Sequence, residues 1–483
     1  MADFTCFFDR ALELYEKREL PQALKYSFKA VTKAPLRWAA YVLMLKSLAR
    51  LVLPSYCVLA LKAAKRSVIN ILDYAHYLLL KKELAAIQPL QCGGAQKILF
   101  IVRDMGIGGV SRVNLDIIQG MAGGPFEFHV AAASPVNNAW FSQFKACCRT
   151  VIVPKKELSS IRIWGKYFCQ IARKMNIQTV AVSNSYVGYQ VLPYLKSEIP
   201  SIKAVDILHM EGMWGTTDFS AWIIPYLDKR VLISNSLKDH MLKQYKKFGA
   251  ADKYSGRLEV IYNGIDTLNY TSARYRKGKF KAENGIPQDV KLISFIGRFS
   301  QQKLPQLFVD IANGVLKQMP AQGLKFVMAG DGELMGDVKK DIKMYGLEKY
   351  FSLTGALQAD KVAELLADTY LLLISSLNEG MPLVMFEAML MGVPVISAPV
   401  GAIAEVIEDG ANGRLVCQRE NASTYVKAVD DFISGRLDYD EISNKARRTI
   451  SERYSIKKMI HGYTEIFQGL HSPVIVKGRR PAA

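Results

Sequence analysis

The stretch Asn378-Glu379-Gly380-Met381-Pro382-Leu383-Val384-Met385-Phe386-Glu387-Ala388-Met389 decides the fold that this sequence predicts. An apolar run, residues 370–375, precedes it and is typical of a buried parallel strand. Pro382 stands where a first helical turn tolerates a proline, and the expected helix ends before Gly392. A strand therefore ends, a loop turns, and a helix N-terminus points back at the strand's carboxyl end. Parallel α/β sheets bind their ligands at that end.

Two carboxylates lie on this strand-loop-helix unit. Glu379 falls in the loop, and Glu387 falls well inside the helix. The free N–H groups of such a loop and helix end suit an anion or a sugar hydroxyl. A solvated surface position is the ordinary interpretation of a single glutamate. Two of them in this context indicate a ligand site.

Length and composition narrow the class of protein. The 483-residue chain has room for about three domains, and its 50% hydrophobic content is ample for large cores. A formal net charge of +19 favours anionic partners, namely phosphorylated ligands, an anionic membrane or nucleic acid. Nucleic acid is not expected, because no nucleic-acid-binding motif is recognisable. The seven cysteines are scattered without metal-ligand spacing, which predicts a reduced, cytoplasmic chain.

The first residues do not predict export or membrane insertion. Asp3 and Asp9 stand where a signal peptide would be basic. The apolar run 51–61 is shorter than the roughly 18–20 residues of a spanning helix. We therefore expect a cytoplasmic protein.

Residues 1–94 are predicted to form an all-α extension. Ala23 and Ala30 fall near the small-residue positions of a tetratricopeptide-like helical hairpin, although the match is loose. Between Glu19 and Asp73 there are nine basic and no acidic residues, with aromatic residues interleaved. Such a surface suits the cytoplasmic face of an anionic membrane. A small helical domain with solvated lysines explains it equally well.

Residues 95–285 alternate strands with helical stretches, which predicts a doubly wound sheet. After the strand 97–102, the glycines Gly106, Gly108 and Gly109 would let a phosphate approach the backbone closely. The spacing of the third glycine is wrong for a dinucleotide site. A tight strand-to-helix turn is the structural alternative.

His209 directly follows another predicted strand of this segment, residues 204–208. This position at a strand's carboxyl end is where a ligand would bind. A lone histidine is usually structural, so both interpretations are open on position alone.

Residues 286–455 predict a second doubly wound domain, and the polar, lysine-rich stretch 267–288 before it reads as a linker. Beyond the strand 292–296, the cations Arg298 and Lys303 suit a diphosphate. Residues 456–483 are expected to form a helix that crosses back to the first domain, followed by a basic tail.

One acidic motif resembles a metal site but is not expected to bind a metal. Asp438-Tyr439-Asp440 has the D-x-D pattern of a metal site. It lies in a charged helical region far from any strand end, so we expect it to be solvated and to bind no metal.

The motif E-x-G-x-P-x-x-x-x-E-A-M after a buried strand resembles the E-x7-E signature of retaining, nucleotide-sugar-dependent glycosyltransferases of family 4, also called glycosyl transferases group 1. The turn Asn263-Gly264-Ile265-Asp266 and the strand end at Gly330 resemble further landmarks, in the expected order, within residues 97–470. The chain departs from the family pattern at Leu304, where a glycine is usual. The resemblance implies a GT-B fold, in which two doubly wound parallel-sheet (Rossmann-like) domains face a cleft.

The resemblance also implies roles for single residues. Arg298 and Lys303 would hold the diphosphate of a nucleoside-diphosphate sugar. Glu387 would accept hydrogen bonds from its ribose, while Glu379 and His209 would face its sugar. Further donor contacts are implied for Gly297, Gly330, Gly355, Leu357, Gly380, Met381 and Leu383, and contacts with phosphates or acceptor for Gly106, Gly108 and Gly109.

The chemistry that the resemblance implies needs no protein nucleophile, cofactor or divalent metal, because the departing phosphate can take the proton of the incoming hydroxyl. The acceptor would be a glycan or a lipid-linked glycan, as in cell-surface polysaccharide or lipopolysaccharide synthesis. A basic helix within residues 155–174 could dock a lipid-linked acceptor or simply cover the sheet. Two alternatives remain open, a nucleotide-sugar epimerase of similar fold and a catalytically inactive, transferase-like scaffold.

Overall fold

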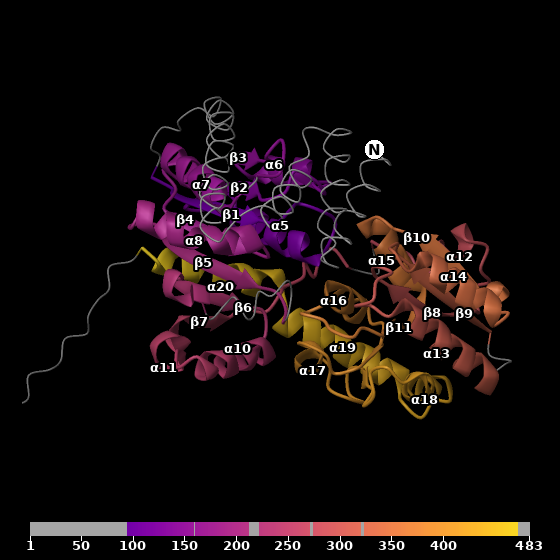
Figure 1. Cartoon of the computed structure of the whole chain (residues 1–483). Helices are drawn as coiled ribbons and strands as arrows, with labels where there is room; N and C mark the ends of the chain where they lie inside the picture. Colours follow the sequence, from indigo (N-terminus) through magenta and orange to yellow (C-terminus); the bar gives the residue numbers. More distant parts are fainter. Residues whose placement is uncertain (1–93, 159, 212–221, 271–273, 320–322, 472–483) are drawn as a thin grey trace, which may run out of the picture. The chain divides into compact units, whose positions relative to one another are not determined.

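The computed structural model describes residues 94–158, 160–211, 222–270, 274–319 and 323–471 (Figure 1). Almost all of the predicted helical extension, its tetratricopeptide-like hairpin and its basic surface lie outside these residues, as does the basic tail. Those expectations therefore stay predictions.

The first sheet is entirely parallel, and its described strands are ordered β3-β2-β1-β4-β5-β6-β7. The strands are β1 (Gln96–Val102), β2 (Phe126–Ala132), β3 (Thr150–Ile152), β4 (Thr179–Ser183), β5 (Lys203–Leu208), β6 (Lys229–Leu232) and β7 (Leu258–Val260). The helices between them are α5 (Gly109–Met121), α6 (Phe141–Cys147), α7 (Ile161–Met175), α8 (Tyr186–Glu198), α10 (Asn235–Lys247) and α11 (Ala251–Tyr254), with short 3₁₀ helices η2 (Ile224–Tyr226) and η3 (Ser255–Arg257).

The second sheet is also parallel throughout, in the order β10-β9-β8-β11-β12-β13 within the described chain. Its strands are β8 (Lys291–Ile296), β9 (Leu324–Ala329), β10 (Phe351–Gly355), β11 (Thr369–Ile374), β12 (Val395–Ser397) and β13 (Arg414–Leu415). The accompanying helices are α12 (Lys279–Glu283), α13 (Pro305–Gln318), α14 (Met335–Met344), η4 (Glu348–Tyr350), α15 (Ala359–Asp368), α16 (Leu383–Leu390), α17 (Ile403–Val406), α18 (Ala422–Ile433) and α19 (Tyr439–Arg453).

Both sheets are doubly wound, which confirms the predicted fold class. In the first sheet the strand order reverses between β1 and β4, and in the second between β8 and β11. The central strands are buried on both faces, which explains their continuous apolar runs. A reversal of strand order opens a crevice at the carboxyl ends of the two strands. The fold therefore has two such crevices, one in each sheet.

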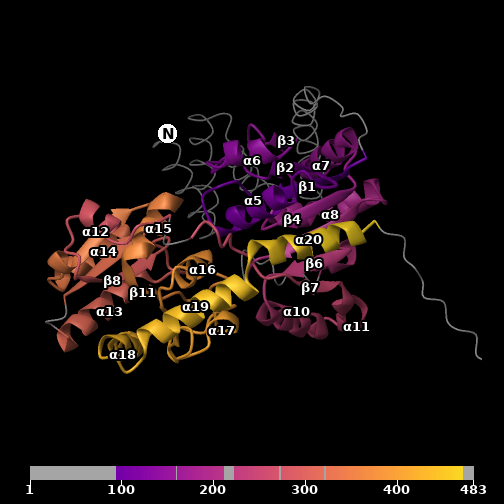
Figure 2. The same ribbon diagram turned by 180° about the vertical axis from the view of Figure 1, so that it is seen from behind.

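The last described helix, α20 (Ile456–Gly469), packs on the first sheet (Figure 2). Its Met459, Tyr463 and Phe467 share a buried core with side chains of β1 and α5. A Cβ atom on Gly120 of α5 would lie 2.5 Å from Ile460 Cγ1, so this glycine permits the close approach of the two helices. The chain thus returns to the first sheet after it has completed the second.

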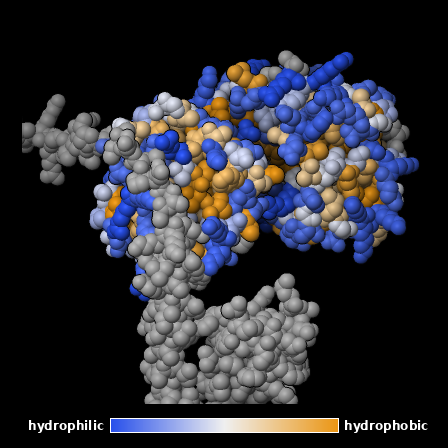
Figure 3. Space-filling view, turned by 90° about the horizontal axis from the view of Figure 1, so that it is seen from above, coloured by the Kyte–Doolittle hydropathy of each residue, from blue (hydrophilic) through white to orange (hydrophobic). Residues whose placement is uncertain are grey.

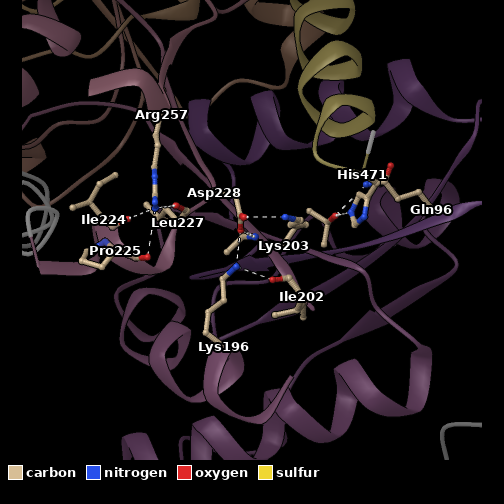
Figure 4. A network of polar contacts seen from close by, with 12 residues as sticks. Gln96, Lys196, Ile202, Lys203, Ile224, Pro225, Leu227, Asp228, Arg257 and His471 are labelled. Carbon is tan, nitrogen blue, oxygen red and sulfur yellow. Dashed lines mark hydrogen bonds and ion pairs between the residues drawn. The ribbon is translucent and has the colours of Figure 1, made fainter. Parts of the chain in front are cut away.

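The amino ends of the first sheet's strands are held by a separate polar network (Figure 4). The Asp228 carboxylate accepts hydrogen bonds from Lys196 Nζ at 2.6 Å and from the backbone N–H of Ala204 at 2.9 Å. His471 Nε2 lies 2.8 Å from Thr179 Oγ1, so the end of the described chain is tied to β4. This network lies at the edge of the sheet opposite to the ligand-binding edge.

The predicted linker, 267–288, is wrong in part. It contains the helix α12, whose Phe280 is 3% exposed and packs with Ile286 in a buried cluster of the second domain. Asp368 accepts the backbone N–H groups of Gly278 and Lys281, which fixes the start of this helix. Two apolar side chains among many lysines were too few for the sequence pattern to predict this helix.

A glutamate of the second domain caps a helix of the first. Glu405 in α17 accepts the backbone N–H groups of Asn235 at 3.0 Å and Ser236 at 2.7 Å, at the N-terminus of α10. It also accepts the Tyr262 hydroxyl at 2.7 Å. Burial raises the pKa of Glu405, but the hydrogen bonds outweigh burial and hold that pKa below its usual value.

A buried ion pair joins the neighbouring strands β5 and β6. Both side chains, Asp206 and Arg230, are 0% exposed, and their closest N–O distance is 2.6 Å. The Arg230 guanidinium also donates to the Tyr245 hydroxyl at 2.7 Å. The two charges compensate each other, and neither side chain is accessible to solvent.

We expect Asp206→Ala to lower the free energy of unfolding by about 3–5 kcal/mol, because it leaves the Arg230 charge buried and uncompensated. Urea-induced unfolding followed by circular dichroism measures this. The control is Glu198→Ala, which breaks an ion pair with Arg173 in which both side chains are 54% exposed. This change should cost no more than about 1 kcal/mol. Equal effects of the two changes would contradict the assigned role of the buried pair.

Candidate functional site

A cleft with a volume of about 690 Å³ lies between the carboxyl edges of the two sheets. Its walls include the loops after β1 and β4 in the first sheet and after β8 and β11 in the second. These four strands flank the two points where strand order reverses. The cleft therefore joins the two ligand-binding crevices of the fold.

Glu379 lies in this cleft and is held by two donors. Its Oε1 accepts Ser376 Oγ at 2.6 Å and Lys303 Nζ at 2.5 Å. The Glu379 side chain is 6% exposed and that of Lys303 is 25% exposed. The sequence-predicted sugar contact and the predicted diphosphate contact are thus an ion pair in this structure.

Glu387 lines the same cleft from the second turn of α16. Its Oε1 accepts the hydroxyl of Tyr270 at 2.7 Å. Burial raises the pKa of Glu387, while the Tyr270 hydrogen bond and the charge of Arg112 partly oppose this rise. Glu379 and Glu387 thus have different surroundings although they lie on one loop-helix unit.

His209 is buried at the end of β5, and it lines the cleft. Its Nε2 lies 2.8 Å from the hydroxyl of Ser183 at the end of β4. Burial lowers the pKa of His209 to about 4. The imidazole is therefore neutral near pH 7 and can present one N–H donor and one acceptor.

Arg298 lines the cleft beyond β8 with an exposed side chain, and it forms no ion pair within the described residues. Lys303 follows in the same loop, and Leu304 then adopts a left-handed backbone conformation with φ 46° and ψ 57°. This is the position where the family pattern has glycine. The loop accordingly adopts a conformation that favours glycine although a leucine occupies the position.

Hydrogen bonds to a polar side chain fix the glycine loop after β1. Asp104 Oδ1 accepts the Gly106 N–H at 2.9 Å and Asn137 Nδ2 at 2.9 Å. Gly108 and Gly109 line the cleft, and a Cβ atom on either would meet nothing within 4 Å. Steric crowding therefore does not require a glycine at position 108 or 109. A Cβ atom on Gly106, in contrast, would clash with the side chain of Asn137.

A close backbone contact joins the two walls of the cleft. A Cβ atom on Gly380 would lie 1.9 Å from the carbonyl oxygen of His209. Met381 O accepts Asn263 Nδ2 at 3.4 Å in the same region. Only a residue without a side chain fits at position 380.

The structure brings together most of the residues that the sequence singled out. The residues of that set on the cleft wall are Gly106, Gly108, Gly109, His209, Gly297, Arg298, Lys303, Glu379, Gly380, Met381, Leu383 and Glu387. Gly330, Gly355 and Leu357 are not on it. Gly330 instead supports the Arg298 loop, since its Cβ would lie 1.9 Å from Gly297 O. The assigned roles of all these residues stay predictions.

Sequence reasoning missed several polar residues of the cleft region. Tyr270 was assigned to a linker, although its hydroxyl contacts Glu387. Asn114 and Asn263 line the cleft, are 1% and 4% exposed, and each has an amide oxygen without a hydrogen bond from any described residue. A buried acceptor without a donor is a candidate ligand contact. The only sequence signal was the position of Asn263 in the N-G-I-D turn.

The part of the chain that the structure describes contains no group of three or more His, Cys, Asp or Glu side chains placed to hold a metal ion. Asp438 instead caps α19 by accepting the N–H of Glu441. The predicted independence from metals is left as a prediction.

Comparisons with known proteins agree with this geometry. Residues 276–449 match the family model of glycosyl transferases group 1. Across this segment, the chain is similar to group 1 glycosyltransferases. The segment contains Arg298, Lys303, Glu379 and Glu387, so the second wall of the cleft belongs to the part that resembles this family.

Two curated relatives are similar to part of this chain. N-acetyl-alpha-D-glucosaminyl L-malate synthase of Bacillus anthracis is 28% identical over 210 residues, which are 44% of this chain and 53% of that protein. The UDP-Gal:alpha-D-GlcNAc-diphosphoundecaprenol alpha-1,3-galactosyltransferase of Escherichia coli is 26% identical over 219 residues, 44% of this chain and 54% of that protein. The chain thus spans about half the length of these relatives.

A solved structure extends the likeness to both sheets. HepE (Alr3699) of Anabaena, crystallised in complex with UDP, superposes with a TM-score of 0.65 over 77% of this chain and 100% of its own. The sequence identity is 20%, so this likeness establishes the fold alone. The two sheets together have the GT-B fold, and the segment matched by the family model contains the second of them.

We expect Gly380→Ala to destabilise the protein by about 1–3 kcal/mol, because the new methyl group overlaps the His209 carbonyl and the two cleft walls must move apart. Thermal unfolding measures this as a lower transition midpoint. The control is Gly109→Ala on the opposite wall, which adds a methyl group to open space. It should leave the midpoint unchanged or slightly higher. A wild-type midpoint for Gly380→Ala would contradict the contact.

Proposed function

We propose that this protein is a retaining glycosyltransferase that moves a sugar from a nucleoside-diphosphate sugar to a hydroxyl group of a glycan or lipid-linked acceptor. The observation that carries the proposal is the meeting of Arg298, Lys303, Glu379 and Glu387 in one cleft. They provide two cations and two differently placed carboxylates at the carboxyl edge of a sheet. That combination suits a ligand with a diphosphate and two sets of sugar hydroxyls.

In this proposal the diphosphate lies between Arg298 and Lys303. Arg298 is exposed and, among the residues that the structure describes, has no ion-pair partner to give up. Lys303 already donates to Glu379, but an ammonium group has three donors and can hold a carboxylate and a phosphate together. The two cations would neutralise the negative charge that develops as the nucleoside diphosphate departs.

The two carboxylates take separate parts of the donor. Glu387 accepts from the ribose hydroxyls, and Glu379 accepts from hydroxyls of the transferred sugar. The N–H groups at the start of α16 add donors beside Glu379. His209 is neutral near pH 7, so it supports the sugar as a hydrogen-bonding group and not as a cation.

The transfer step needs no protein nucleophile. The bond between the anomeric carbon and the phosphate oxygen breaks, and the bond to the acceptor oxygen forms on the same face of the sugar. The acceptor hydroxyl gives its proton to the departing phosphate oxygen. The transferred sugar therefore keeps its anomeric configuration, and no divalent metal is required because Arg298 and Lys303 supply the positive charge.

We further propose that the acceptor is bound on the first domain, near Gly108, Gly109 and His209, and that it is presented at an anionic membrane surface. The E. coli relative is named for a diphosphoundecaprenol-linked acceptor. None of the helices in the described ranges is long and apolar enough to cross a membrane. On the face in Figure 3, hydrophobic patches interrupt a largely hydrophilic surface. The membrane part of the proposal rests on the charge of residues 20–72.

We expect one of UDP, GDP and ADP to raise the thermal unfolding midpoint, with or without EDTA, because ligand binding stabilises the folded state. Arg298→Ala and Lys303→Ala should each weaken this binding by about 1.5–3 kcal/mol, since each removes a charge-assisted contact. Lys445→Ala is the control, because Lys445 pairs with Glu441 on the surface. Loss of wild-type binding and turnover in EDTA would contradict the metal-free site.

We expect Glu387→Gln and Glu379→Gln to differ. Glu387→Gln should weaken nucleoside diphosphate binding by about 1–3 kcal/mol, because its contacts are alike in ground and transition states. Glu379→Gln should lower turnover strongly and leave that affinity nearly unchanged, because its carboxylate lies near the positive charge of an oxocarbenium-like transition state. Calorimetric titration and turnover kinetics measure the two effects. The reverse pattern would exchange the roles, and two unchanged variants would refute the donor site.

A further inference from the structure

Tyr270 connects the segment between the two sheets to the proposed donor site. It lies in the polar stretch after β7, and its hydroxyl donates to Glu387 Oε1 at 2.7 Å, across 117 residues of sequence. Tyr270 is partly buried, as Glu387 is. Tyr270 therefore makes a specific contact with Glu387 and is not a solvated side chain of a linker.

Neighbouring polar contacts hold Tyr270 in place. On its N-terminal side, Asp266 accepts the Leu268 N–H at 3.0 Å and Asn269 Nδ2 at 2.7 Å. On its C-terminal side, the ring of Tyr275 lies 6.4 Å from the Tyr270 ring, and the Tyr275 hydroxyl donates to Asp360 in α15 at 2.8 Å. The residues before Tyr270 are thus held by Asp266, and the neighbouring Tyr275 is held by a helix of the second domain.

Glu387 has a small number of charged and titratable neighbours. Tyr270 approaches from the interdomain segment, and Arg112 and Asp116 approach from α5 of the first domain. Arg112 Nε itself bonds the Asp116 carboxylate at 2.8 and 3.0 Å. Burial is the largest influence on the Glu387 carboxyl and favours its protonated form, whereas Tyr270 and Arg112 favour the carboxylate.

We propose that Tyr270 is a positioning residue that orients the Glu387 carboxylate toward the donor ribose and keeps it ionised. This inference rests on the proposed function, in which Glu387 accepts from ribose hydroxyls. A carboxylate offers about four lone-pair sites, so one hydrogen bond from Tyr270 leaves room for two ribose hydroxyls. Tyr270 therefore assists the nucleotide and does not compete with it.

The experiment compares Tyr270→Phe with Tyr275→Phe in calorimetric titrations of UDP between pH 5 and pH 8, with GDP and ADP run in parallel. Both variants lose one hydroxyl from the same segment, but only Tyr270 contacts Glu387. An ionised Glu387 binds ribose, so affinity falls as the pH drops through the pKa of Glu387. Without the Tyr270 hydroxyl that pKa rises, and the acid loss of affinity should move to higher pH. Tyr275→Phe should keep the wild-type midpoint.

At pH 7 we expect Tyr270→Phe to weaken nucleotide binding about three- to tenfold, the usual effect of one lost hydrogen bond. Burial raises the pKa of Asp116 to about 6, so this residue titrates in the same range. The comparison is therefore repeated with Asp116→Asn added both to the wild-type protein and to the Tyr270→Phe variant. The shift caused by Tyr270→Phe should persist in that background.

Two results would overturn the inference. An unchanged acid midpoint in Tyr270→Phe would mean that the hydroxyl does not act on Glu387, and tighter binding at pH 7 would mean that Tyr270 competes with the ribose. Glu387→Gln in the same titration separates these results from a failure of the proposed function. If Glu387→Gln retains wild-type affinity, or if none of the three nucleotides binds, the donor site itself is refuted and this inference falls with it.

Discussion

The backbone contact between Gly380 and the His209 carbonyl sets the distance between the two ligand-binding edges of the molecule. Each sheet brings its own crevice to the carboxyl ends of its strands, but neither crevice alone has all the groups of the cleft. The second sheet supplies the cations and the two glutamates, and the first supplies His209 and the glycine loop. A side chain at position 380 would separate these two sets of groups.

The charged side chains in and beside the cleft are largely paired with one another, although the whole chain is strongly basic. Lys303 pairs with Glu379, and Arg112 pairs with Asp116 next to Glu387. Arg298 is the exposed cation of the second wall that has no such partner among the described residues. In the described part of the chain, the cations that line the cleft, Arg103, Arg298 and Lys303, equal in number its carboxylates Asp104, Glu379 and Glu387, so the positive charge is local to Arg298 and is not a net excess. In the proposed function, an anionic ligand would be positioned by that residue more than by the net charge of +19.

The sequence predicted the two doubly wound sheets because buried parallel strands are continuous apolar runs, such as 370–375. Most of the residues that it singled out lie on the cleft wall, because strand-end loops and helix starts are readable locally. It did not predict the Tyr270 contact, since that contact depends on how a polar segment folds against a helix 117 residues later. The left-handed backbone of Leu304 was indicated only by the glycine that the family pattern has there, because a leucine itself gives no local signal for that conformation.

In the proposed function, the Glu405 cap on α10 has a consequence for the rates of substrate entry and product release. The cap consists of hydrogen bonds from the Asn235 and Ser236 N–H groups to a carboxylate that is only partly buried. If α17 moved away from α10, water could replace both sides of these bonds. Each exchange would then cost only the net value of a hydrogen bond to a charged group, about 1.5–3 kcal/mol, and not its gross strength. An enzyme of the proposed kind could break and remake such a joint in every catalytic cycle without unfolding either domain.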